Sequence, residues 1–307
     1  MLIGLFSAGS SPGVSTAVLA MGSVWPSPCV VIDADPSGGD LLAAGGSVVE
    51  ADREHNLVEL MRIGRQGQIP QVLDSQITRL PVGVDVVAGL AHPGQSAGVV
   101  WGELAEGLQA VTHRDVLVDL GRWGSPFAPA PLLRACDVLL VVVRTQLRGL
   151  RRAERVLPLI KEDLDRHNPG AGDVGLLIVN DHGPYAVPDI ARRLSAPVLG
   201  ELPLDARTAA VFSDGATAPR HMERSALARA VPGVVRTVGQ LAQSRQALGR
   251  RGPLIRQQAV DPSPSPVRRV TTPPSPSPSP AAAAVGLREM SRSPRRLSAV
   301  PPTGTDS

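Results

Sequence analysis

Short runs of β-branched and other apolar residues recur along residues 2–202, and stretches with helical spacing separate them. Runs as apolar as these are typical of a parallel sheet that helices cover on both faces. We therefore predict a doubly wound, mostly parallel α/β domain, whose ligands bind at the carboxyl ends of the strands. The predicted strands are residues 2–7, 29–33, 84–88, 116–119, 138–144, 175–180 and 198–202. The predicted helices are residues 17–21, 97–110, 150–166, 188–194 and 225–248, the last interrupted at Pro232.

The C-terminal part of the chain differs in composition from the rest. From about Ser244 the sequence consists of Pro-Ser repeats, Arg pairs and an Ala run, with too few apolar residues to build a core. We predict that residues 1–248 form the domain and that residues 249–307 are a disordered tail. Residues 244–307 hold ten Arg against three acidic residues, a formal charge of +7, whereas residues 1–243 carry −4. The basic character of the chain therefore belongs to the tail.

The tail suits an anionic partner, DNA or a membrane surface, because bound arginines release counterions. A solvated linker is the alternative interpretation. The longest apolar run, residues 138–143, is far shorter than the about 20 residues of a membrane-spanning helix. Cys29 and Cys136 each begin an apolar run, as buried thiols do. We expect a cytoplasmic protein without a transmembrane segment, secretion signal or disulfide.

A stripe of apolar residues marks the last predicted helix. With helical spacing these residues would lie on one face, and we predict that this face packs on the sheet. A membrane-surface helix is the alternative, but the stripe lacks Phe and Trp and includes Arg245. The stripe is Val234, Val238, Leu241 and Leu248.

The segment after the first predicted strand has the features of an anion-binding loop. Residues 8–16 read Ala-Gly-Ser-Ser-Pro-Gly-Val-Ser-Thr, and a predicted helix follows. A strand, a loop of small residues and a helix N-terminus offer backbone N–H groups and the positive end of a helix dipole. Two other predicted strands end in carboxylates, at Asp33-x-Asp35 and at Asp119. Such carboxylates can hold Mg²⁺ through its waters and position an attacking water.

These motifs resemble those of the ParA/MinD family of deviant Walker ATPases, whose loop reads Lys-Gly-Gly-x-Gly-Lys-Thr/Ser-Thr. The resemblance spans Met1 to about Gly215, with the motifs in the family's order. It implies a P-loop NTPase-like fold with an ATP/ADP-Mg site. The loop residues that it implies for the nucleotide are Gly9, Ser10, Ser11, Gly13, Val14, Ser15 and Thr16.

The resemblance also implies roles outside the phosphates. Ser15 would be the magnesium ligand, with Asp33 and Asp119 as further metal-site residues. Asp35, in the run Asp-x-Asp-Pro, would position the attacking water as the catalytic residue. The segments Leu-Ile-Val-Asn at 177–180 and Gly-Glu-Leu-Pro-Leu-Asp at 200–205 are similar to the family's adenine-side segments. Asn180 and Pro203 would therefore contact the base.

The sequence departs from the family at both lysines of the loop. The phosphate-binding lysine falls on Val14, and the signature lysine, which in the family reaches the nucleotide of a partner subunit, falls on Gly9. A charge-assisted hydrogen bond contributes roughly 1.5–3 kcal/mol, so the loss at Val14 is expected to weaken nucleotide binding by about one to two decades. Hydrolysis is expected to suffer more. Arg122 and Arg144, at strand ends, are candidate substitutes.

Two functional interpretations stay open. The first is a nucleotide-binding positioning or partitioning switch with weakened or lost ATP hydrolysis. The second is a nucleotide-free pseudo-ATPase adaptor that works with protein partners of a partitioning, secretion or pilus apparatus. A loop that is only a tight turn is less consistent with the convergence of Ser15, Asp35 and Asp119 on one sheet edge.

An oxidoreductase is the rival from another class. Gly9, Gly13 and Asp33 have a spacing that also resembles a dinucleotide site. The short-chain type needs a Tyr-x-x-x-Lys pair, which the only tyrosine, Tyr185, does not form.

Overall fold

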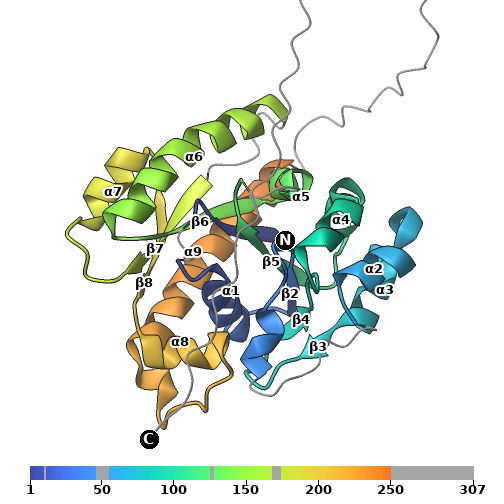
Figure 1. Cartoon of the computed structure of the whole chain (residues 1–307), viewed down its shortest axis with the longest axis horizontal. Helices are drawn as coiled ribbons and strands as arrows, with labels where there is room; N and C mark the ends of the chain where they lie inside the picture. Colours follow the sequence, from blue (N-terminus) through green and yellow to red (C-terminus); the bar gives the residue numbers. More distant parts are fainter. Residues whose placement is uncertain (10–11, 46–54, 125–127, 168–173, 250–307) are drawn as a thin grey trace, which may run out of the picture. The chain divides into compact units, whose positions relative to one another are not determined.

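The computed structural model describes residues 1–9, 12–45, 55–124, 128–167 and 174–249. Its centre is an eight-stranded sheet in the order β3-β4-β2-β5-β1-β6-β7-β8 (Figure 1). All neighbouring strands are parallel except β3 and β4. The strands are β1 (Leu2–Ser7), β2 (Cys29–Asp33), β3 (Thr78–Arg79), β4 (Asp85–Val87), β5 (Asp115–Arg122), β6 (Val138–Arg144), β7 (Val174–Asn180) and β8 (Val198–Pro203).

Helices cover both faces of the sheet, as a doubly wound domain requires (Figure 1). They are α1 (Val14–Ser23), α2 (Leu57–Ile63), α3 (Ile69–Val72), α4 (Trp101–Gln109), α5 (Ala130–Ala135), α6 (Leu147–His167), α7 (Val187–Leu194), α8 (Ala206–Ser213) and α9 (Ala226–Gly249). Short 3-10 turns occupy Leu41–Gly45, Arg65–Gly67, Leu73–Gln76, Pro93–Gly98 and Met222–Arg224. The predicted fold class is confirmed.

Two hydrophobic cores lie on opposite faces of the sheet. Successive residues of a strand point to opposite faces, so β1 supplies Leu2 and Phe6 to one core and Ile3 and Leu5 to the other. The first core packs under α2 to α7, and the second packs under α1, α8 and α9. Because β1 is buried along its whole length, its chemistry is confined to the loop that follows it.

The predicted strands are all present, with ends shifted by at most three residues. The interruption predicted at Pro232 is wrong, because α9 runs continuously from Ala226 to Gly249. A proline inside a helix removes one hydrogen bond. The buried side chains of Val231, Val234 and Val238, which belong to the second core, offset that loss.

The last helix packs on the sheet, as predicted. Val238 is fully buried, and the side chain of Val234 lies against Gly200 of β8. The side chain of Leu248 lies outside the described residues, as do Ser10, Ser11 and all of the predicted tail except Gly249. None of the helices in the described part of the chain is long and apolar enough to cross a bilayer. Cys29 and Cys136 are free thiols, and burial raises the pKa of Cys29 to about 11.

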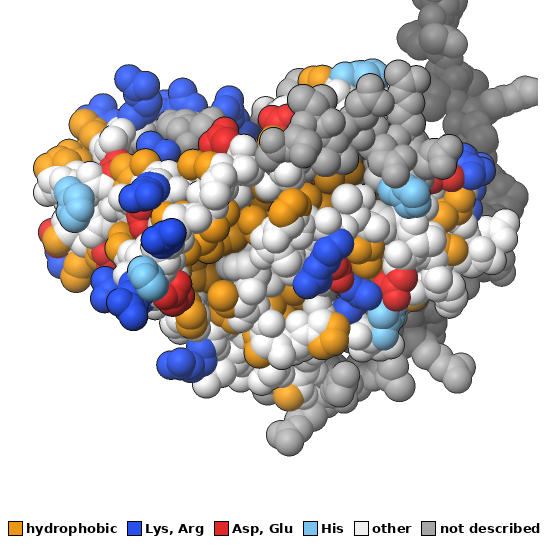
Figure 2. All heavy atoms as spheres, turned by 90° about the horizontal axis from the view of Figure 1, so that it is seen from below, with side chains coloured by type: hydrophobic (Ala, Val, Ile, Leu, Met, Phe, Trp, Pro, Cys, Tyr) orange, Lys and Arg blue, Asp and Glu red, His pale blue; other side chains and the backbone are white. Residues whose placement is uncertain are grey.

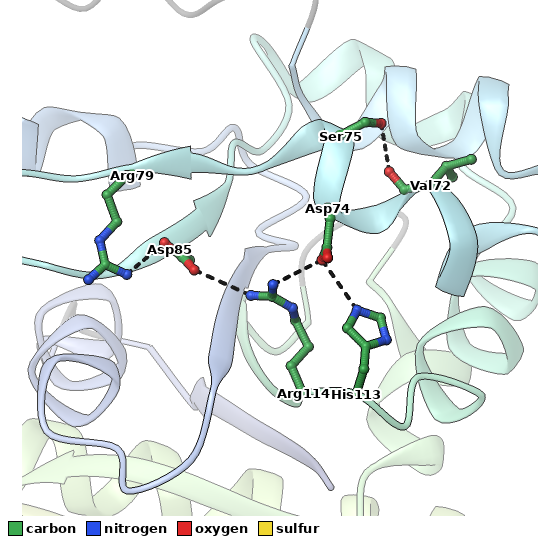
Figure 3. Close-up of polar contacts among 7 residues, drawn as sticks. All are labelled: Val72, Asp74, Ser75, Arg79, Asp85, His113 and Arg114. Atoms are coloured by element: carbon green, nitrogen blue, oxygen red, sulfur yellow. Dashed lines mark hydrogen bonds and ion pairs between the residues drawn. The ribbon is translucent and has the colours of Figure 1, made fainter.

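A network of ion pairs joins the antiparallel edge of the sheet to the start of β5 (Figure 3). The guanidinium of Arg114 lies 3.0 Å from the Asp74 carboxylate and 3.3 Å from that of Asp85. Asp85 also pairs with Arg79 of β3 at 2.7 Å, and the ring of His113 lies 3.2 Å from Asp74. The Arg114 side chain is only 15% exposed, whereas that of Arg79 is 65% exposed. Arg114 is therefore the member that links the edge to the core.

We predict that Arg114→Met lowers the free energy of unfolding by about 1–3 kcal/mol, because it removes the least exposed cation of the network and leaves the Asp85 carboxylate, 23% exposed, with only the exposed Arg79 as an ion-pair partner among the described residues. Arg79→Met removes an exposed cation from the same Asp85 and is expected to cost less than about 1 kcal/mol. Urea unfolding of both variants beside the wild type measures the difference. Equal losses in the two variants would contradict the linking role of Arg114.

Candidate functional site

The carboxyl ends of four neighbouring strands meet at one edge of the sheet. In the parallel register, Leu5 of β1 and Asp33 of β2 both pair with Asp119 of β5, and Ser7 pairs with Arg122. Strand β6 continues the edge on the other side of β1. The loop after β1 therefore emerges between the ends of β5 and β6.

The loop enters α1 at Gly13. Gly13 has φ 103° and ψ 41°, a left-handed conformation that glycine adopts without strain. The N-cap residue, Gly13, forms no side-chain hydrogen bond, and the first N–H groups of α1 have no side-chain partner among the described residues, so they can meet a ligand. They line a pocket of about 200 Å³, together with residues from three strand ends. The pocket is lined by Ser7, Pro12, Gly13, Val14, Ser15, Thr16, Asp35, Asp119, Gly121 and Arg122.

A short hydrogen bond joins the loop to β5. The Ser15 hydroxyl donates to Asp119 Oδ2 at 2.6 Å, and the backbone N–H of Gly121 donates to Asp119 Oδ1 at 2.9 Å. Asp119 is 1% exposed. Because the Ser15 proton is committed to Asp119, the lone pairs of its hydroxyl oxygen are left for a cation.

Burial is the main influence on Asp119. Desolvation, with a smaller contribution from the nearby charge of Asp35, raises its pKa to about 6 against the lowering effect of the hydrogen bonds from Ser15 and Gly121. A divalent cation beside this carboxylate would stabilise its ionised form. The oxygen donors of the pocket, which include the Ser15 hydroxyl and the carboxylates of Asp35 and Asp119, are of the kind that Mg²⁺ prefers.

These residues fit a magnesium ion that keeps much of its water. In the described part of the chain, no group of three or more His, Cys, Asp or Glu side chains is placed to hold a metal ion by itself. Mg²⁺ is usually held by one or two carboxylates, a few waters and substrate phosphates, so a complete protein cage is not required.

Asp35 reaches the pocket because Gly121 has no side chain. Gly121 has φ +64°, and a Cβ there would overlap the Asp35 carboxylate. The carboxylate of Asp35 also accepts from the backbone N–H of Ser37 at 2.8 Å. Asp35 and Asp119 thus approach each other across a glycine.

Asp33 is not brought to the pocket with them. Its carboxylate accepts backbone hydrogen bonds from Leu41 at 3.2 Å and Asp35 at 3.4 Å. Gly39 and Gly89 enclose it, since a Cβ on either would overlap it. Burial, and then the charge of Asp119, raises the pKa of Asp33 well above its ordinary value. Its observed contacts order the turn that carries Asp35.

Of the two predicted base contacts, Pro203 lies beside the loop and Asn180 does not. A pocket of about 70 Å³ brings Pro203 together with Gly13 and Thr16 of the loop and with Arg144. Asn180 does not line it, because its amide donates to Glu201 at 2.6 Å and accepts from the backbone of His182 at 2.9 Å.

At the two positions where the family has lysines, Val14 and Gly9, the structure shows other contacts. Val14 is 8% exposed and packs into the core under α1. Gly9 has φ +133°, and the guanidinium of Arg152, from α6, lies against it. The sequence analysis missed Arg152. The signal that could have found it is the four-residue spacing of Arg144, Arg148 and Arg152, which places the latter two on one face of a helix.

No family model matches the sequence, and no curated protein is significantly similar to it. The structure is similar to a ParA family ATPase from Chlorobium tepidum TLS, with a TM-score of 0.60 over 77% of this chain and 97% of that chain. The fold is that of the ParA/MinD ATPases. The resemblance to the ParA/MinD family, which the motifs indicated, is confirmed as a similarity of fold.

Two further similar structures contain a bound nucleotide. The septum site-determining protein MinD from Pyrococcus horikoshii OT3, complexed with Mg-ADP, has a TM-score of 0.60 at 15% identity, over 80% of this chain and 98% of that chain. A putative plasmid partition protein from Borrelia burgdorferi B31, bound to AMPPNP, has a TM-score of 0.59 at 11% identity, over 78% and 98%. Identities this low establish the fold, and the chemistry of the loop has to be argued from its own residues.

We predict that Asp119→Asn changes how stability depends on pH. The folded wild type holds the Asp119 proton up to about pH 6, whereas the unfolded chain releases it near pH 4. The folded state therefore binds more protons in that window, and the wild type loses stability as pH rises through it. An asparagine does not titrate, so the stability of the variant relative to the wild type should rise by about 1–3 kcal/mol between pH 4 and pH 7.5.

Urea unfolding of both proteins at several pH values measures this difference. Asp137→Asn, at the start of β6 and away from the pocket, is the matched control. A difference that stays constant with pH would contradict the raised pKa of Asp119.

Proposed function

We propose that the domain is a nucleotide-dependent positioning or partitioning switch of ParA/MinD type, which binds ATP or ADP with Mg²⁺ and hydrolyses ATP slowly or not at all. The observation that carries the proposal is the hydrogen bond from Ser15 to Asp119 at the uncapped N-terminus of α1. It joins a metal-binding hydroxyl, a buried carboxylate and free N–H groups in one pocket. A turn with only a structural role would need none of these together.

The residues divide the work by their chemistry. Ser15 and Asp119 would hold Mg²⁺, and Asp35, the proposed catalytic residue, would orient the attacking water. The backbone of Gly9 to Thr16, including Ser10 and Ser11, would bind the phosphates. Asp33 would support the metal site through the turn that carries Asp35. Pro203 would contact the base from the pocket wall. Asn180 would contact the base only if its amide exchanged the hydrogen bond to Glu201 for one to the base.

Slow hydrolysis follows from the positions of the missing lysines. A cation on the transferred phosphoryl group acts most strongly in the transition state, where charge develops. Val14 offers no charge there, and its side chain is committed to the core. Binding, which also uses the backbone and Mg²⁺, loses less than catalysis does.

The buried Val14 also favours a second candidate, the nucleotide-free adaptor. In either case we propose a cytoplasmic protein with partners in a positioning apparatus. Residues 1–248 would be the folded domain, and the basic tail 249–307 would tether it to DNA or a membrane surface.

We predict that calorimetry with millimolar Mg-ATP and Mg-ADP detects binding to the full chain. Ser15→Ala removes the hydroxyl and should abolish the dependence of binding on Mg²⁺, while Ser23→Ala, at the other end of α1, should not. The absence of both heat and a thermal shift, with the domain shown to be folded, would contradict the switch and leave the adaptor.

We predict that the wild type releases phosphate from ATP more slowly than about 1 per second, the low end of ordinary enzyme rates. Val14→Lys should raise ATP affinity, by up to about one to two decades, because its aliphatic stem can pass along the buried surface and its charge can reach the phosphates. Val14→Met, similar in length but uncharged, is the control. Turnover of the wild type at 1 per second or more would refute impaired catalysis.

A further inference from the structure

A second pocket lies on the other side of the loop, facing β6 and α6. Its volume is about 90 Å³. One wall is the loop itself, at Ala8, Gly9 and Pro12, and the other is the end of β6 and the start of α6, including Arg144 and Arg148. Pro12 lines this pocket, the pocket with Ser15 and the pocket with Pro203, so the three open around one residue of the loop.

Arg152 adds a third guanidinium to this side of the loop. Its Nη1 atom lies 2.5 Å from the place that a Cβ on Gly9 would take. The φ of +133° favours a glycine at position 9, and the Arg152 guanidinium lies where a side chain would begin. The loop carries no lysine at this point, and a cation from α6 occupies the space instead.

The three arginines lack counter-charges within the described residues. The Nε of Arg144 is buried and has no hydrogen-bond partner. None of Arg144, Arg148 and Arg152 forms an ion pair with an Asp or Glu in the described part of the chain. Other arginines on or beside the same helix do form them: Arg166 with Glu162, Arg134 with Asp163 and Arg193 with Glu154.

The surface around α6 is also rich in basic side chains. Lys and Arg side chains gather toward the end of the molecule where α6 and α7 lie, on the left in Figures 1 and 2. From Leu147 to Arg155 the helix carries four Arg and a single acidic residue, Glu154. Unpaired cations held together in this way repel one another unless an anion joins them.

We propose that Arg144, Arg148 and Arg152 form a phosphate-binding site on the α6 side of the loop. The guanidinium groups offer planar pairs of N–H donors that match phosphate oxygens. Arg144 also lines the pocket with Thr16 and Pro203, so a nucleotide bound between Pro203 and the loop passes beside it. The ligand, if the proposed function holds, is the phosphate chain of the bound nucleotide, and free phosphate is the other source of the same chemistry.

The test compares variants that each remove charge from one face of α6. Arg148→Gln, Arg152→Gln and the double variant are measured beside Arg155→Gln, whose exposed side chain lines none of these pockets and donates to the Arg151 carbonyl. Calorimetry of the full chain uses Mg-ATP, Mg-ADP and pyrophosphate as probes, at two salt concentrations. We expect each single variant to weaken Mg-ATP binding about 3- to 10-fold and the double variant about 10- to 100-fold, with Arg155→Gln within 2-fold.

The probes separate this inference from the proposed function. If the wild type binds nucleotide and all variants match Arg155→Gln, the arginine site is refuted while the switch stands. If the wild type binds pyrophosphate but no nucleotide, and the double variant binds neither, the arginine site stands for free phosphate and the switch is refuted. If the wild type binds none of the probes, both are refuted.

Discussion

The parallel pairing of β1 with β5 on one side and β6 on the other is the constraint on which the rest of the structure depends. Because β1 is buried throughout, it contributes only apolar packing until its last residue. The loop that follows then emerges between two strands that carry side chains of opposite charge near their carboxyl ends. Strand β5 delivers Asp119, and β6 delivers Arg144. The site is thus a product of strand order, and neither half could form if β1 lay at an edge of the sheet.

This order gives the loop an acidic side and a basic side. Asp35 and Asp119 line the pocket on the β5 side, and the arginines of β6 and α6 lie on the other. A magnesium nucleotide has the complementary arrangement, with a cation at one edge of an anionic phosphate chain. Without a ligand, Arg144, Arg148 and Arg152 have no carboxylate partner among the described residues, whereas a bound phosphate would supply the missing negative charge. The polarity of the two sides is therefore the physical argument for a ligand, and it does not depend on the similarity to other proteins.

The sequence predicted the strands and the residues that lie near their ends. It did not predict contacts that depend on packing between distant segments. Apolar runs located seven strands, and the position of Asp119 and Asp35 just at or beyond strand ends placed them with Ser15 in one pocket. The two-residue strand β3 is too short to leave a periodic pattern. The direction of Asp33 depends on two glycines that lie against its carboxylate, Gly39 in the turn after β2 and Gly89 after β4, and no local motif shows this. Pro232 misled because tertiary packing on the sheet outweighed one lost helical hydrogen bond.

Gly9 and Val14, which stand at the positions of the family's two lysines, differ in what surrounds them. At position 9 the guanidinium of Arg152 lies where a side chain would begin. A cation from α6 therefore lies beside this part of the loop, where the family has its signature lysine. At position 14 no cation of the described residues takes the place of the lysine, because the Val14 side chain is buried in the core under α1. Ground-state binding responds to the summed charge near the phosphates, whereas catalysis needs a cation aimed at particular oxygens as charge develops. Under the proposed function, a loop that has arginines nearby but lacks the charge at position 14 would therefore bind a nucleotide better than it would cleave it.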